Sequence, residues 1–161
     1  MAVYKLSIDD WQESHFELIA IHTSLENFRL AFFMNRELQI LLNRVKSSLK
    51  IASNPVIHHF NRFEFTDDKN DISWFLLENK SLHQTPSKNT SGLFAKNEMM
   101  SSTQFLIPEA KKADFVFKIE GEKFQINSKT ICQKIKNIPM VTMVYPLDSQ
   151  KIKFKNHLIL S

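Results

Sequence analysis

The pattern of apolar and polar residues near the start of the chain predicts a strand followed by a helix. Residues 16–23 are an apolar run of strand length, so we expect a strand there; acidic residues upstream have capping-box spacing, which leaves a helix as the alternative. Residues 23–26, Thr-Ser-Leu-Glu, form a firmer capping box that predicts a helix to about Glu37. Four apolar residues at helical spacing form its expected buried stripe: Leu25, Phe28, Ala31 and Phe32.

The middle of the chain predicts paired strands and then a loop. Residues 41–51 alternate imperfectly between apolar and polar side chains, and we expect a strand there. Residues 58–65 and 72–78 read as the two strands of a hairpin, because the polar residues 66–71 between them are typical of a turn. Residues 79–104 are rich in Ser, Thr, Asn and Lys, so we expect a long, mobile surface loop.

A second helix is expected in the last third of the chain. Asn127 or Ser128 can cap this helix, and Pro139 ends it. Three residues at helical spacing would form its buried side: Ile131, Ile135 and Ile138. The remaining expected strands are β-prone runs at residues 3–8, 114–120, 140–145 and 151–160.

This order of elements predicts a single α+β domain over residues 1–161. Strands that follow one another closely favour a mostly antiparallel sheet, and the two helices are expected to pack on one face of it. We expect a ferredoxin-like or ACT-like arrangement.

Glycine is scarce, and its scarcity excludes several common ligand sites. The chain has two glycines, Gly92 and Gly121, where average usage of about 7% would give roughly eleven. A P-loop, a dinucleotide-binding turn and a nucleophile elbow each need at least two glycines close together. We therefore expect no nucleotide-binding loop and no cofactor.

Metal-binding spacing is also missing from the sequence. Cys132 is the only cysteine, which excludes an internal disulfide and a multi-cysteine zinc site. The acidic residues Asp67, Asp68 and Asp71 cluster in one turn, but they lack the glycine and the glutamate that a calcium loop requires. We expect an ordinary polar turn there and no metal.

The hydrophobic runs of the chain are short. The longest continuous apolar run is five residues, at 30–34, where a bilayer span needs about 20. The first ten residues contain two acidic side chains and no long apolar stretch, so we expect no signal peptide. These features indicate a cytoplasmic protein without a membrane segment.

Positive charge is concentrated in the last third of the chain. Residues 109–161 hold 10 lysines and 5 acidic residues, whereas residues 1–108 hold 11 basic and 12 acidic side chains. Such a surface permits contact with an anion or with RNA. We favour the alternative that residues 151–155 are an edge strand whose lysines prevent aggregation, with Ile152 and Phe154 facing the core. The candidate anion or RNA contacts are Lys111, Lys112, Lys151, Lys153 and Lys155.

Candidates for catalysis are few. His22 would lie at the end of an apolar strand, where a structural histidine is more common than a catalytic one. Glu109 and Asp114 could form an acid–base pair, but nothing in the sequence fixes the distance between them. Cys132 is expected to be a buried or half-buried, inert thiol. An enzyme is therefore less favoured than a binding protein.

Residues 107–115, Ile-Pro-Glu-Ala-Lys-Lys-Ala-Asp-Phe, resemble the signature of the IPExxxVDY family of Bacteroidota. The chain departs from the signature at two positions, with Ala113 in place of Val and Phe115 in place of Tyr. A role that rests on a phenol hydroxyl would therefore be missing at Phe115. The resemblance implies a bacterial cytoplasmic protein of unassigned activity, with no catalytic residue to carry over. The stretches that support it are residues 18–23, 29–31 and 155–160.

The sequence as a whole favours a non-enzymatic binding or regulatory domain that acts through contacts with a partner protein or a second copy. This hypothesis rests on the missing catalytic constellation, the expected open sheet and the long polar loop. The first alternative is an RNA-associated protein that uses the basic C-terminal surface. The second is a small enzyme with a site near His22 or near Glu109 and Asp114.

Overall fold

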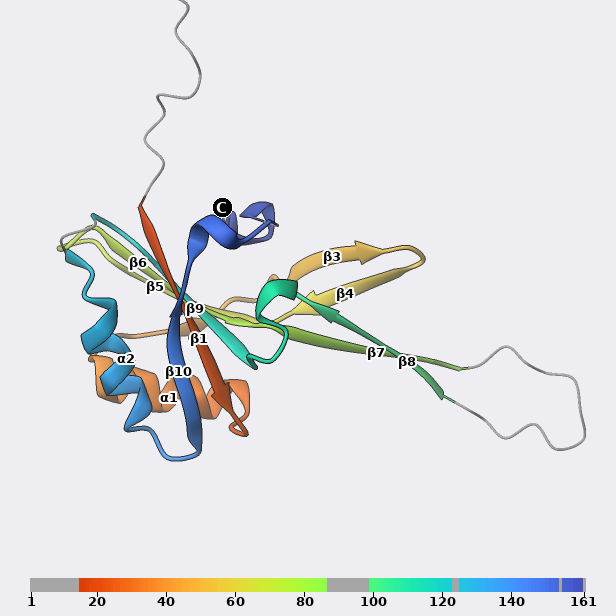
Figure 1. The fold of residues 1–161 in the computed structure, drawn as a ribbon, viewed down its shortest axis with the longest axis horizontal. Helices are drawn as coiled ribbons and strands as arrows, with labels where there is room; N and C mark the ends of the chain where they lie inside the picture. The colour runs from red at the N-terminus through yellow and green to blue at the C-terminus, as the bar shows by residue number, and fades with distance from the viewer. Residues whose placement is uncertain (1–14, 87–98, 123–124, 154, 161) are drawn as a thin grey trace, which may run out of the picture.

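The centre of the structure is a six-stranded sheet in which every pair of neighbouring strands is antiparallel (Figure 1). In spatial order the strands are β10 (Val141–Leu147), β1 (Phe16–Thr23), β9 (Phe115–Glu120), β6 (Ile72–Glu78), β5 (Arg62–Asp67) and β2 (Asn43–Arg44). The computed structural model describes residues 15–86, 99–122, 125–153 and 155–160. The strand expected at residues 3–8 lies outside these ranges.

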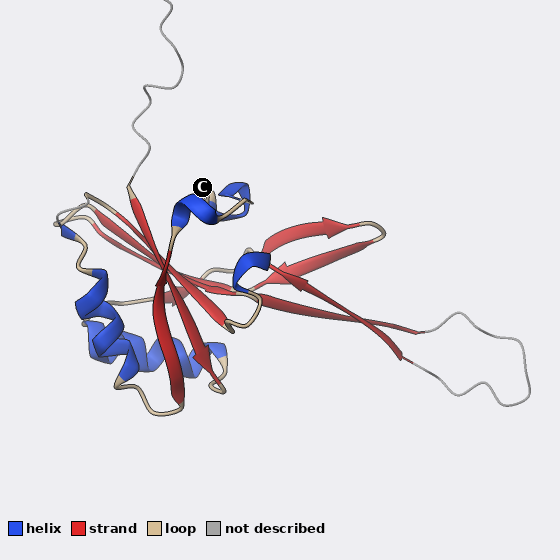
Figure 2. Ribbon diagram, in the orientation of Figure 1, coloured by secondary structure: helices blue, strands red, loops and turns tan. Residues whose placement is uncertain are grey.

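Both helices lie on the same face of the sheet, as Figure 2 shows. α1 (Asn27–Leu38) follows β1, and α2 (Ser128–Lys136) connects β9 to β10. As expected, the side chain of Asn127 caps α2 by accepting the backbone N–H of Thr130 at 3.1 Å. The α+β class, with two helices on one face of a mostly antiparallel sheet, is confirmed. The finer ferredoxin-like or ACT-like assignment stays a prediction.

The first hydrophobic cluster lies between the helices and the sheet. Alternate residues of β1 and β9 face the helices, because successive side chains of a strand point to opposite faces. The three isoleucines expected on the second helix are buried here. The central members of this first cluster are Ile19, Ile21, Leu30, Met34, Phe117, Ile119, Ile131, Ile135 and Ile138.

Turns and short 3-10 helices, rather than α-helices, cover the other face of the sheet. Leu18, Ala20 and Val116 point to this face and belong to a second cluster with residues 106–113 and two residues of the C-terminal segment. Because β1 and β9 are covered on both faces, their sequences are nearly continuous apolar runs. The short 3-10 helices in these covering segments are η2 (Pro108–Ala110), η4 (Ser149–Lys151) and η5 (Lys155–Leu158).

Two hairpins extend away from the central sheet (Figure 1). The loop expected over residues 79–104 is wrong at its two ends, because these ends pair as the strands of the second hairpin. Residues 87–98 lie outside the described ranges. Serine and threonine are compatible with a strand, and pairing satisfies the backbone groups without requiring a large core. The hairpins are β3 (Leu49–Ser53) with β4 (Val56–Phe60) and β7 (Lys80–Pro86) with β8 (Met99–Phe105).

The strand expected at residues 58–65 is divided at Asn61, where the chain leaves the β3–β4 hairpin and enters the central sheet. The Glu78 carboxylate accepts hydrogen bonds from both the backbone and the side chain of Asn61, at 3.1 and 3.0 Å. The strand expected at residues 41–51 is divided in the same way into β2 and β3. The β5–β6 pairing confirms the expected turn at residues 66–71.

The strand expected at residues 151–160 is wrong, because this segment forms η4 and η5. The lysines there do not protect an edge strand: the segment crosses the second face of the sheet and buries Ile152 in the cluster. Phe154 lies outside the described residues. β10 extends past its expected end at residue 145 and includes Pro146, which an edge strand tolerates because its nitrogen has no N–H to leave unpaired.

The buried side of α1 also differs from the expected stripe. Leu25 and Ala31 of that stripe are buried as expected, but Phe28 and Phe32 are 59% and 64% exposed. The helix buries Leu30 and Met34 in their place. The expected capping box does not form, since Glu26 is the N-cap and makes no side-chain cap hydrogen bond. A helix that starts elsewhere in the sequence presents a different set of residues to the sheet.

Substitutions on α1 test this correction. Met34→Ala should lower the free energy of unfolding by about 2–4 kcal/mol, because it opens a cavity in a fully buried position. Phe32→Ala, on the exposed side of the same helix, should change it by roughly 0.5 kcal/mol or less. Urea unfolding followed by circular dichroism measures both values. Equal losses would mean that the expected stripe is the buried one after all.

Candidate functional site

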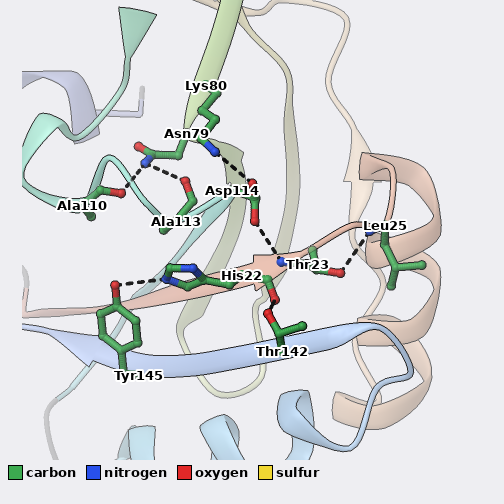
Figure 3. A network of polar contacts seen from close by, with 10 residues as sticks. All are labelled: His22, Thr23, Leu25, Asn79, Lys80, Ala110, Ala113, Asp114, Thr142 and Tyr145. Atoms are coloured by element: carbon green, nitrogen blue, oxygen red, sulfur yellow. Dashed lines mark hydrogen bonds and ion pairs between the residues drawn. The ribbon is translucent and has the colours of Figure 1, made fainter.

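A fully buried asparagine, Asn79, joins the sheet to the covering segment on its second face. Its side-chain amide donates to the carbonyl oxygens of Ala110 at 2.8 Å and Ala113 at 3.0 Å (Figure 3). Its side-chain oxygen accepts the backbone N–H of Ile107 at 2.9 Å. Sequence reasoning missed this residue, because an asparagine that follows an apolar strand is also what the start of a loop looks like.

Asp114 continues this network toward the edge of the sheet. Its backbone oxygen accepts the N–H of Asn79 at 3.0 Å, and its carboxylate accepts the backbone N–H of Thr23 at 2.9 Å. The ammonium group of Lys80 lies 3.1 Å from the same carboxylate (Figure 3). The hydroxyl of Thr23 in turn donates to the carbonyl oxygen of Met140 at 3.0 Å. Hydrogen bonds therefore connect Asn79 to the residue that precedes β10.

His22 connects β1 to β10 through its side chain and its backbone. Its Nε2 atom lies 3.2 Å from the hydroxyl oxygen of Tyr145, and its carbonyl oxygen accepts the hydroxyl of Thr142 at 3.1 Å (Figure 3). Thr142 is the extra residue where the register of the two strands shifts, so its hydroxyl supplies a donor at the irregular position. The described contacts of His22 all hold the two strands together.

Glu109 binds the C-terminal segment rather than Asp114. Its side chain accepts the backbone N–H of Lys153 at 2.8 Å, while the Asp114 carboxylate holds Thr23 and Lys80. The Glu109 contact brings two lysine-bearing segments side by side. All five candidate lysines are exposed: Lys111, Lys112, Lys151, Lys153 and Lys155.

Cys132 is half-buried on α2, next to the first cluster. Burial raises the pKa of its thiol, so less of it is ionised at neutral pH than in an exposed cysteine. This agrees with the interpretation of an inert thiol.

The acidic turn after β5 is organised by its own side chains. The carboxylate of Asp67 accepts the side-chain amide of Asn70 at 2.6 Å and the backbone N–H of Lys69 at 3.1 Å. The hydrogen bond from the Asn70 side chain is the main cause of the lowered pKa of Asp67. Within the described ranges, no three His, Cys, Asp or Glu side chains are grouped as a metal ion would require.

β10 presents the longest free edge of the central sheet. Among the described strands it lies at the end of the strand order and pairs only with β1, whereas the opposite end is the two-residue strand β2. The sequence of β10, Val-Thr-Met-Val-Tyr-Pro-Leu, contains no charged residue. Met143 is 53% exposed, and Met140 just before the strand is 54% exposed. Natural edges are commonly protected by lysines, and this one has none within the strand.

Comparison of the chain with family models, with curated proteins and with solved structures finds no match. The resemblance to the IPExxxVDY family therefore stays a prediction. No helix within the described ranges has the length and apolar composition needed to cross a bilayer.

Removal of the Asn79 side chain tests its role. Asn79→Ala would leave two carbonyl oxygens and one N–H without partners in the interior, so the free energy of unfolding should fall by about 2–4 kcal/mol. Asn156→Ala removes an exposed asparagine and should change it by roughly 0.5 kcal/mol or less. Denaturant unfolding of both variants measures the difference. A loss at Asn79 no larger than at Asn156 would refute the assigned role.

Proposed function

We propose that this protein is a binding domain that acts through protein contacts, and that β10 takes up an extended segment of the partner. The observation that carries the proposal is the free side of β10, a seven-residue edge strand without a charged side chain. Such an edge offers a row of backbone N–H and C=O groups with which another strand can pair.

The length and rigidity of this edge support the proposal. Pro139 and Pro146 bound the stretch that can pair, because proline has no N–H to contribute to a ladder. Residues 141–145 are the part of β10 that lies between them. His22 and Thr23 hold this stretch against β1, so a partner would meet a preformed surface rather than a segment that must first be ordered.

The contacts of the catalytic candidates also favour a binding role. His22, Glu109 and Asp114 each hold two segments of the fold together. The resemblance to the IPExxxVDY family and a cytoplasmic location remain part of the proposal.

A peptide selection tests the proposal. Random peptides are selected for binding to the full chain, and amide hydrogen exchange is then measured in the complexes. We expect slower exchange at those N–H groups of residues 141–145 that point away from β1, because an added strand shields them. Met143→Glu should weaken binding about tenfold or more, since it places a charge beside the paired backbone.

Ile57→Glu is the matched control, because Ile57 is also 53% exposed but lies on β4. Selected peptides should bind this variant as they bind the unmodified chain. Peptides that protect no amide of β10, or that bind both variants equally, would contradict the proposal.

RNA binding is a second candidate function. It is favoured by the contact between Glu109 and Lys153, which brings the lysine-bearing segments together on one side of the sheet. It predicts that affinity for a structured RNA falls steeply as salt rises, and that the double variant Lys111→Glu, Lys153→Glu loses most of it. Fluorescence anisotropy measures this. No binding at low salt would exclude the candidate.

A further inference from the structure

We propose that the segment taken up by β10 alternates acidic and apolar side chains, with the acidic ones on the helix side of the sheet. This inference rests on the proposed function and names the chemistry of the partner. It comes from the charges that lie on each side of the free edge.

The helix side of the edge is positively charged. α2 packs against β10, and its sequence, Ser-Lys-Thr-Ile-Cys-Gln-Lys-Ile-Lys, contains three lysines and no acidic residue. Lys129, Lys134 and Lys136 are all exposed, and none of them takes part in an ion pair with another described residue.

On the opposite side of the sheet, the exposed side chain that β10 itself presents is apolar. Tyr145 and Leu147 lie on the face of β10 that packs against the second cluster. Met143 shares their face, since side chains two residues apart in a strand point the same way. Its side chain is exposed, so an apolar residue on an added strand can cover it.

An added strand meets these two surfaces at once. It would lie about 4.8 Å from β10, and its side chains would alternate between the two faces of the sheet. Those on the helix side would lie on the face of the sheet that α2 covers, and those on the other side would lie beside Met143. Acidic and apolar residues in alternation satisfy both surfaces.

The same charges argue against a second copy of the chain as the partner. Two copies that pair antiparallel through β10 keep the same face of the sheet on the same side. Their α2 helices would then be neighbours, each with three unpaired lysines, and like charges at this distance repel. A partner of opposite charge removes this repulsion.

Two synthetic peptides test the inference: Glu-Val-Glu-Val-Glu-Val-Glu and Lys-Val-Lys-Val-Lys-Val-Lys, each with capped ends and a fluorescent label. We expect the glutamate peptide to bind the full chain about tenfold more tightly than the lysine peptide at low ionic strength, because the net positive charge of α2 attracts the first and repels the second. This preference should shrink at high ionic strength. A peptide of the same composition with the glutamates and valines in two blocks should bind more weakly, because it cannot match both faces.

Charge reversal on α2 provides the decisive comparison. The triple variant Lys129→Glu, Lys134→Glu, Lys136→Glu should prefer the lysine peptide. The matched control, Lys46→Glu, Lys50→Glu, Lys69→Glu, reverses three exposed lysines away from β10 and should keep the original preference. Circular dichroism confirms that both variants remain folded.

The outcomes separate this inference from the proposed function. The inference would be overturned if peptides protect β10 without a preference for charge. It would also be overturned if the α2 variant keeps the original preference. Either outcome leaves the proposed function standing. A dimer in sedimentation experiments with β10 protected would show that a second copy is the partner. If neither these peptides nor selected ones protect β10, and the chain is monomeric, both ideas are wrong.

Discussion

The structure depends on the hydrogen bonds of one buried side chain, that of Asn79. The second face of the sheet is covered by turns and short 3-10 helices, which pair fewer of their own backbone groups than an α-helix does. Asn79 supplies two donors and one acceptor to residues 107–113 and leaves none of its amide groups unpaired. Its position between β6 and β7 fixes where the second hairpin leaves the central sheet.

A short series of hydrogen bonds connects Asn79 to the free edge strand β10. Asn79 binds the backbone of Asp114, Asp114 binds Thr23, and Thr23 binds Met140 at the start of β10. The register of β10 is thus held at one end by this series and along its length by His22. Two of the residues considered for catalysis, His22 and Asp114, hold the edge in place, which is what a preformed binding surface requires.

The sequence predicted the elements whose signals are local. The isoleucines of α2 and their Asn127 cap have helical spacing, and the hairpin of β5 and β6 has a polar turn, so both were predictable. The exposure of Phe28 and Phe32 could not be predicted from the sequence, because the start of α1 depends on contacts of Thr23 with distant residues. Asn79 and the free edge were not predictable either, since a buried asparagine and an unpaired strand are defined by neighbours far along the chain.

The central claim is that β10 accepts an additional strand on its free side. The most direct measurement is the set of nuclear Overhauser effects between isotope-labelled protein and the unlabelled glutamate–valine peptide. The account predicts cross-strand effects between backbone protons of the peptide and those of Met143 and Val144. Effects only to other surfaces, such as Phe32 on α1 or Leu82 on β7, would contradict it.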